Sequence, residues 1–329
     1  MLKLRNIVLA IAALTLGTGV MIASAVSVSM TDTADGATEV QLRVDGNQRR
    51  NILVLGTDDE AGLCDVMMLA SLDLDGGNAT VVQLPRDTYA AYTAASYKKL
   101  NGAYSSLGGA RATADFLESA MGLEIDNYVC MDLDTLGRIV NAVGGVDVNV
   151  PRDMYYNDPE QGLSINIKKG MNHLNGDTAQ DFVRYRAGYA DGDLGRIDAQ
   201  KLFVAALFTK ISESFSPVLV AKLAVVLKDV EMDMSIPSLL SLGEKILKLK
   251  GENITLLTLP GEQAIATQSG ASYYVISRDA CADVARKYLG GEGTFDPDGR
   301  FRNGDYDSFV KIYEGRTEYK AVTLQELAT

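Results

Sequence analysis

Short apolar runs alternate with segments of helical periodicity along most of this chain. Strand-like runs cover 51–56, 66–74, 79–84, 129–133, 146–150, 164–168, 254–259 and 273–276. Helical patterns cover 108–121, 134–143, 175–184, 193–211, 217–227, 237–249 and 278–289. Strands that alternate with helices favour an α/β fold, which we expect to be an α-β-α sandwich around a central mixed sheet.

The amino-terminal segment predicts a membrane helix. No charged residue occurs from Ile7 to Met30, and Lys3 and Arg5 precede this stretch. A helix of this length, at about 1.5 Å per residue, crosses a hydrocarbon core of roughly 30 Å. The flanking charges predict an amino terminus on the inside. The alternative is a cleaved signal peptide with its cleavage site at 23–25. Both readings place the remaining chain outside the cytoplasmic membrane.

The composition excludes several classes of function. With 31 basic and 43 acidic residues the net charge is −12, which argues against a nucleic-acid-binding protein with a broad basic face. The single histidine, His173, excludes a His-rich metal site, and we expect it to be a loop side chain. Three cysteines cannot all pair within one chain. Either Cys64 and Cys130 form one bridge, or the buried thiols are inert.

Arginines mark the candidate site, because the chain has no P-loop, no G-x-G-x-x-G and no G-x-S-x-G motif. Arg86 follows a predicted strand directly. Arg184 and Arg186 are two residues apart, and they share a face only if the chain is extended there. We therefore expect the preceding helix to end near Arg184. In the following helix Asp193, which could cap it, lies on one stripe with Arg196 and Gln200.

Convergent arginines in an acidic protein predict a phosphate or pyrophosphate ligand, since guanidinium groups bind phosphate oxygens bidentately and stay charged. Asp58, Asp65 and Asp87 stand at the ends of predicted strands. Such carboxylates, together with phosphate oxygens, are ligands that Mg²⁺ prefers. The simpler alternative is that these residues are turn formers, caps and solvated helix ends. On residues alone, the sequence indicates an extracytoplasmic α/β domain that binds an anion.

The same residues stand in an ordered series of motifs that resembles the LytR-CpsA-Psr family. The series runs from about residue 50 to 212 and includes Asn51-Ile-Leu-Val-Leu-Gly-Thr-Asp58, Cys64-Asp65, Gln83-Leu-Pro-Arg86-Asp87-Thr, Lys99-Leu-Asn101, Val183-Arg184-Tyr-Arg186 and Asp193-Leu-Gly-Arg196-Ile-Asp-Ala-Gln200. The resemblance implies an envelope phosphotransferase that moves a glycopolymer from a polyprenyl-pyrophosphate carrier onto peptidoglycan as a phosphodiester. The polymer would be a teichoic acid, a capsular polysaccharide or a related glycan.

The resemblance also implies a role for each candidate residue. Asp58 and Asp65 would ligate Mg²⁺, and Asp65, Arg86 and Asp87 would be catalytic. Asp87 and Asp193 would orient arginines or help to deprotonate the acceptor. The pyrophosphate would be bound by Arg86, Arg184, Arg186, Asp193, Arg196 and Gln200.

Two positions depart from the family pattern. Asp59-Glu60 stands where the family often has a small residue and an arginine, and Ala199 stands where a further arginine is common. Both changes remove positive charge, so they bear on affinity for the phosphate. A lipid-pyrophosphate hydrolase and a non-catalytic envelope receptor or regulator for an anionic lipid or polymer are the alternative functions.

The resemblance gives a domain plan and a location. We expect a membrane anchor or signal-anchor over 1–30, a linker over 31–50 and the catalytic core over 51–212. Residues 213–290 would complete the same domain, and 291–329 would form an irregular tail. The protein would lie in the bacterial cell membrane as a single-pass protein with the catalytic domain outside. Its partners would be the lipid-linked polymer, peptidoglycan and the cytoplasmic membrane, without nucleic acid.

Overall fold

The computed structural model describes residues 26–32, 38–44, 49–58, 62–91, 99–159, 163–267, 269–291, 294–301 and 319–328. Before residue 49, and at Asp58, it describes the backbone alone. The chain divides into two units, Met1–Gln48 and Arg49–Thr329.

The first unit contains an antiparallel hairpin of β1 (Val26–Asp32) and β2 (Thr38–Val44). This hairpin occupies the end of the uncharged segment and much of the expected linker. The rest of the predicted anchor lies outside the described residues. Among the residues that are described, none of the helices combines the length and apolar composition that a membrane crossing requires.

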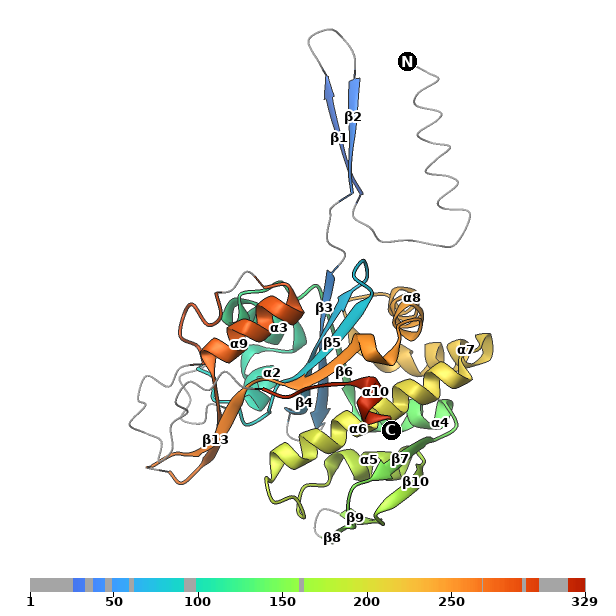
Figure 1. Ribbon diagram of the computed structural model, residues 1–329, viewed down its shortest axis with the longest axis vertical. Coiled ribbons are helices and arrows are strands. Elements are labelled where there is room, and N and C mark those ends of the chain that lie inside the picture. The colour runs from blue at the N-terminus through green and yellow to red at the C-terminus, as the bar shows by residue number, and fades with distance from the viewer. Residues whose placement is uncertain are drawn as a thin grey trace. The chain divides into compact units, whose positions relative to one another are not determined.

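A seven-stranded mixed sheet forms the centre of the second unit and confirms the predicted α/β fold. The strand order is β11-β6-β3-β4-β5-β12-β15 (Figure 1). β3 is parallel to β6, and β5 is parallel to β12, whereas β4 is antiparallel to both of its neighbours. The strands are β3 (Arg49–Asp58), β4 (Leu63–Asp73), β5 (Asn78–Gln83), β6 (Asn127–Asp132), β11 (Glu231–Met232), β12 (Ile254–Thr258) and β15 (Ala321–Thr323).

Helices cover both faces of this sheet, as Figure 1 shows. One face packs against α2 (Ala103–Leu107), α3 (Ala110–Met121) and α9 (Arg278–Val284), which continues as a π-helical turn over Ala285–Leu289. The other face packs against α6 (Asp193–Ser214), α8 (Ile236–Leu247) and α10 (Leu324–Leu327). Along β5, Val82 faces the first layer and Val81 the second, as the alternation of strand side chains requires.

A second cluster of apolar side chains lies beyond α6. It is formed by α4 (Leu133–Ala142), α5 (Gly176–Arg184), α7 (Pro217–Val226) and two antiparallel strand pairs. The pairs are β7 (Val146–Val150) with β10 (Gly170–Leu174), and β8 (Met154–Asp158) with β9 (Leu163–Ile167). Side chains cap the amino-terminal ends of α4 and α5. The Asp132 carboxylate accepts a hydrogen bond from the Thr135 amide, and the Asn175 side chain accepts one from the Thr178 amide.

The carboxyl-terminal part contains more regular structure than the expected irregular tail. β13 (Gly261–Ile265) pairs with β14 (Ser272–Ile276), and β15 lies at the sheet edge beside β12. α10 follows β15 and begins with a capping box formed by Thr323 and Glu326. β14 confirms the strand predicted at 273–276, whereas β13, β15 and α10 carry too few residues for a periodic signal.

One edge of the sheet collects the ends of its central strands. β3, β5, β6 and β12 all end there, and the antiparallel β4 begins there. Ligands of open α/β sheets bind outside the carboxyl ends of the strands. The predicted site residues Asp58, Asp65, Arg86 and Asp87 all belong to this edge.

Candidate functional site

Two arginines and two aspartates from three segments meet at this edge. Arg86 Nη1 lies 2.5 Å from Asp65 Oδ1, and Arg86 Nε lies 3.3 Å from Asp193 Oδ1. Arg196 Nη2 lies 2.8 Å from the same Asp193 oxygen and 3.2 Å from the backbone carbonyl oxygen of Asp65. We call Asp65, Arg86, Asp193 and Arg196 the arginine–aspartate cluster.

A β-bulge places Asp65 in this cluster. Gly56 of β3 pairs with Val66 of β4, whereas the next residue, Thr57, pairs with Cys64. Asp65 is therefore the extra residue of β4, without a partner on β3. Bulges redirect side chains and are common next to active sites. Here the bulge lets Cys64 remain in the core while the neighbouring carboxylate reaches Arg86.

The first turn of α6 supplies the other half of the cluster. Asp193 and Arg196 are three residues apart and therefore lie on one helical face. The prediction that Asp193 caps this helix is wrong. The N-cap residue is Gly192, with a φ of 55°, and Asp193 is the first helical residue. Its carboxylate contacts two guanidinium groups instead of a backbone amide.

Most of the cluster is shielded from solvent, which strengthens the attraction between its charged groups. The Arg196 side chain is 3% exposed, whereas that of Asp65 is 37% exposed. Burial lowers the pKa of Arg196, against the opposing effect of Asp193. Burial also acts to lower the pKa of Arg86, but Asp65 and Asp193 outweigh it and raise that pKa. Both guanidinium groups remain charged at neutral pH, because an ordinary arginine titrates above pH 12.

The cluster has hydrogen-bonding capacity that the described residues leave unused. The Nε atoms of Arg86 and Arg196 and both carboxylate oxygens of Asp193 are buried and make no hydrogen bond to the described residues. Asp193 Oδ1 makes two ion pairs. Buried polar atoms in native proteins are normally satisfied, so such a group calls for an explanation. A phosphate oxygen would satisfy Arg196 Nε, whereas Arg86 Nε already faces Asp193 Oδ1.

The other two predicted arginines, Arg184 and Arg186, lie outside the arginine–aspartate cluster. α5 ends at Arg184, as predicted, and Tyr185 is buried while Arg184 and Arg186 are both exposed. Arg186 is close enough to Arg196 to help lower its pKa, after the larger effect of burial. Arg184 acts on Asp181, where it partly opposes the rise in pKa that burial causes. Its part in binding pyrophosphate stays a prediction.

Asp87 and Gln200 are both engaged with other protein groups. Asp87 Oδ1 lies 2.8 Å from Nζ of the buried Lys99. Gln200 donates to the Val183 carbonyl at 3.0 Å and accepts a hydrogen bond from Gln83 at 3.3 Å. Gln200 thereby ties α6 to the end of α5 and to β5. Sequence reasoning missed Lys99 as the partner of Asp87, since no spacing pattern relates the two.

The described part of the chain shows no group of three or more His, Cys, Asp or Glu side chains that could hold a metal. Asp65 has an exposed carboxylate, and the Asp58 side chain lies outside the described part. Mg²⁺ in phosphate sites takes only one or two carboxylates. Binding of Mg²⁺ by Asp58 and Asp65 therefore stays a prediction.

Cysteine and histidine chemistry takes no part in this cluster. Cys64, Cys130 and Cys281 are free and buried. Burial raises the pKa of Cys64 to about 12 and that of Cys130 to about 11, so neither is a thiolate at neutral pH. Of the two alternatives for Cys64 and Cys130, the structure therefore has the inert buried thiols and not the disulfide. His173 lies exposed in β10, with Nδ1 2.7 Å from Asp147.

The sequence of this chain is similar to those of known proteins over the part that contains the arginine–aspartate cluster. Residues 18–288 match the model of the LytR_cpsA_psr family. The polyisoprenyl-teichoic acid–peptidoglycan teichoic acid transferase TagV of Bacillus subtilis is 31% identical over 234 residues, which are 68% of this chain and 60% of TagV. The transferase TagU of Oceanobacillus iheyensis is 28% identical over 73% of this chain and 75% of its own length.

The fold is also similar to that of a solved structure of a relative. The crystal structure of B. subtilis TagV superimposes with a TM-score of 0.58 at 30% identity, covering 69% of this chain and 90% of that one. This chain spans about three fifths of the full TagV sequence. The family match covers the whole sheet edge on which Asp65, Arg86 and Arg196 lie, and the chain belongs to the LytR_cpsA_psr family.

Proposed function

We propose that this protein transfers a glycopolymer from a polyprenyl-pyrophosphate carrier to peptidoglycan and leaves a phosphodiester. The observation that carries the proposal is the convergence of Arg86 and Arg196 with Asp65 and Asp193 at one sheet edge. The names of the related TagV and TagU transferases support the same class of reaction. The uncharged segment before residue 31 supports a location in the bacterial cell membrane, with the amino terminus inside.

The reaction requires one bond to form and one to break. A sugar hydroxyl of peptidoglycan attacks the phosphorus atom that carries the polymer, and the bridging P–O bond of the pyrophosphate breaks. Negative charge then grows on the departing polyprenyl phosphate. Arg86 and Arg196 are held in place by Asp65 and Asp193, so they stabilise this charge with little rearrangement.

Asp65 is the group best placed to accept the hydroxyl proton. Its side chain is the most exposed of the four in the cluster, whereas Asp193 is 13% exposed and lies between two arginines. Asp87 pairs with Lys99. Asp65 and Asp58 would hold Mg²⁺ when it is bound, and the ion would then neutralise phosphate charge. Arg86 contacts Oδ1 of Asp65, so Oδ2 is the oxygen available to the hydroxyl proton.

A product assay tests the proposal. The purified protein is incubated with a radiolabelled lipid-linked polymer and peptidoglycan oligomers, and the products are separated by size and digested with muramidase. We expect label on muropeptides, linked through a bond that phosphodiesterase cleaves. Free polymer without a muropeptide adduct would assign a lipid-pyrophosphate hydrolase. Binding without any turnover, unchanged in the Asp65→Asn variant, would assign a receptor.

A further inference from the structure

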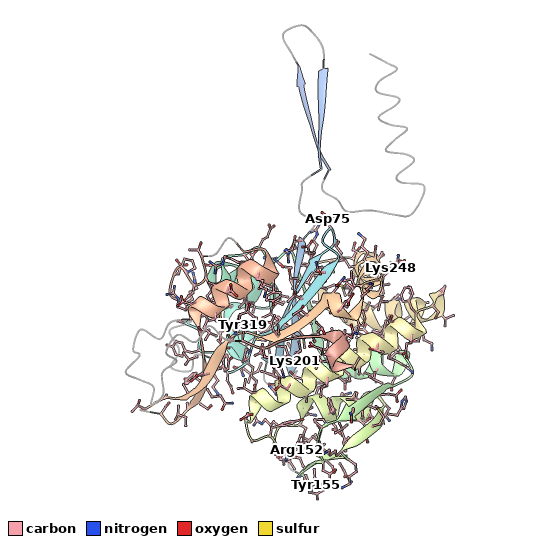
Figure 2. The ribbon with its side chains drawn as sticks, in the orientation of Figure 1. Asp75, Arg152, Tyr155, Lys201, Lys248 and Tyr319 are labelled. Carbon is pink, nitrogen blue, oxygen red and sulfur yellow. The ribbon has the colours of Figure 1, made fainter. Side chains whose placement is uncertain are left out.

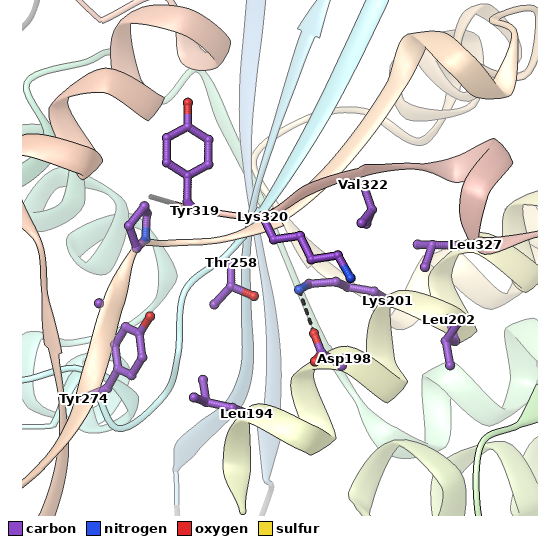
Figure 3. Close-up of a pocket in the computed structure, with 12 residues that line it drawn as sticks. Leu194, Asp198, Lys201, Leu202, Thr258, Tyr274, Tyr319, Lys320, Val322 and Leu327 are labelled. Carbon is purple, nitrogen blue, oxygen red and sulfur yellow. Dashed lines mark hydrogen bonds and ion pairs between the residues drawn. The ribbon is translucent and has the colours of Figure 1, made fainter. Parts of the chain in front are cut away.

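A cavity of about 430 Å³ lies between α6 and the carboxyl-terminal part of the sheet. Figure 3 shows that the residues around it come from four segments. α6 contributes Leu194 and Lys201, β12 contributes Thr258, and β14 contributes Tyr274. Tyr319, Lys320 and Val322 close the opposite side. None of these residues belongs to the arginine–aspartate cluster.

Two lysines give this cavity a positive end. Lys201 is 8% exposed, which is rare for a lysine unless it is paired. Its Nζ atom lies 2.9 Å from Asp198 Oδ1, but the Asp198 side chain is 75% exposed and has strong competition from water. Lys320 points to the same end of the cavity in Figure 3. The Lys201 ammonium group therefore has one exposed carboxylate as its ion-pair partner, and Lys320 adds a second positive charge to the lining.

Two tyrosine rings form the wall opposite α6. The Tyr274 hydroxyl donates to the Leu259 carbonyl at 2.7 Å, and the Tyr319 hydroxyl donates to Asp283 at 2.7 Å. Both hydroxyls are therefore engaged outside the cavity, and the rings are fixed. Fixed aromatic rings beside polar side chains suit a ligand with an apolar face and several hydroxyls, which describes a sugar ring.

A second, much smaller cavity of about 10 Å³ lies between this cavity and the arginine–aspartate cluster. Leu194 and Tyr274 line both cavities, and the other walls of the smaller one include Asp87 and Asp193. Lys201 lies five residues after Arg196 in α6. A substrate with its pyrophosphate at Arg86 and Arg196 would extend past Leu194 and Tyr274 to the larger cavity.

We propose that this cavity is a subsite for an anionic sugar unit of the substrate, with Lys201 and Lys320 binding its phosphate or carboxylate. The inference rests on the proposed function and names where the glycan lies. A prenyl chain fits less well, because an apolar ligand would cover both lysines and offer neither of them a hydrogen-bond acceptor. The anion could belong to the donor polymer, as a phosphodiester, or to the acceptor, as a peptide carboxylate.

The test compares Lys201→Met, Lys320→Met and Lys201→Arg with Lys248→Met in the transfer assay. Lys248 is a matched control, since it is 71% exposed, pairs with Glu244 and directly follows α8, away from Lys201 (Figure 2). We expect Lys201→Met to raise KM about tenfold with a smaller change in kcat, as loss of a charged hydrogen bond predicts. Lys201→Arg should restore most of the affinity. Asp198→Asn should lower KM, because it removes the competing carboxylate.

Paired substrates identify which partner carries the anion. The donor is supplied with phosphodiester-linked or neutral repeats, and the acceptor with free or amidated carboxylates. The effect of Lys201→Met should vanish only for the substrate whose anion has been removed. An unchanged KM for every pair, with active parent protein, would overturn the subsite and leave the transferase intact.

If the parent protein shows no transfer, the proposed function fails and the cavity is tested by binding alone. The probes are a poly(glycerol phosphate) oligomer and a muramyl peptide with free carboxylates, titrated by calorimetry. Weaker binding to Lys201→Met than to Lys248→Met would retain the subsite. Equal binding to both, or no binding to the parent, would exclude it.

Discussion

Arg196 follows Asp193 by one turn of α6, and its Nη2 atom lies 2.8 Å from the Asp193 Oδ1 atom. Because Arg86 approaches the same carboxylate oxygen, one acidic group holds two cations that would otherwise repel each other. The arrangement concentrates positive charge at the sheet edge without leaving it uncompensated.

The first prediction concerns Arg196. Arg196→Lys keeps the charge but loses the fork of donors, and we expect kcat to fall about 100-fold or more, as for other preorganised donors. Transfer assays with thermal melts check this. Arg138→Lys is the control, because Arg138 pairs with Asp229 on the surface at 2.7 Å. Equal rates for the two variants would remove Arg196 from the reaction.

The second prediction separates the two aspartates of the cluster. Asp193→Asn leaves two buried guanidinium groups facing a neutral amide, so we expect a loss of about 3–5 kcal/mol in the free energy of unfolding. Asp65→Asn should cost far less stability, since its side chain is 37% exposed, but should abolish transfer. Urea titration and the product assay measure the two effects. The reverse ranking would contradict the roles given to them.

The third prediction concerns the pH dependence of the buried thiols. In the folded protein the pKa of Cys64 is about 12 and that of Cys130 about 11, above the ordinary value of 9.0. A raised folded pKa stabilises the fold below pH 9, and this contribution is lost as pH rises from 9 toward 12. Denaturant titrations should show that fall, and Cys64→Ser should weaken it. Iodoacetamide should label the cysteines at pH 8 only after unfolding.

The fourth prediction concerns the crossing of α4 and α5. A Cβ atom at Gly176 would lie 2.5 Å from the Gly137 carbonyl oxygen, so the two helices approach too closely for any side chain there. We expect Gly176→Ala to lower the free energy of unfolding by about 1–3 kcal/mol. Gly243→Ala is a suitable control, because nothing lies near its Cβ position in α8 and alanine favours a helix. Similar melting temperatures for both would show that the crossing tolerates a wider spacing.

Periodicity and local chemistry predicted much of the fold. The strands at 146–150 and 79–84 and the helix end at Arg184 follow from alternation, from a run of β-branched residues and from the spacing of two arginines. The short strands β13 and β15 and the hairpin of β1 and β2 were not predicted. Their pairing depends on distant partners, which a local pattern does not contain.

The sequence predicts which residues form the site better than it predicts the contacts that each of them makes. Arg86, Arg196 and Asp65 were chosen from strand ends and helical spacing, and the structure brings them together. Asp193 was expected to be a cap because aspartate usually caps helices, but two neighbouring cations compete more strongly for its carboxylate. The Lys99 partner of Asp87 and the two lysines of the cavity depend on tertiary packing alone.

The bulge at Asp65 has a consequence for how this architecture tolerates change. Thr57 pairs with Cys64 and Gly56 with Val66, so the ladder would be continuous if Asp65 were deleted. Asp65 has no partner residue on β3, so the pairing of β3 with β4 does not depend on it. A one-residue deletion is therefore expected to spare folding while removing the carboxylate, which makes Asp65 a supernumerary residue retained for chemistry and not for architecture.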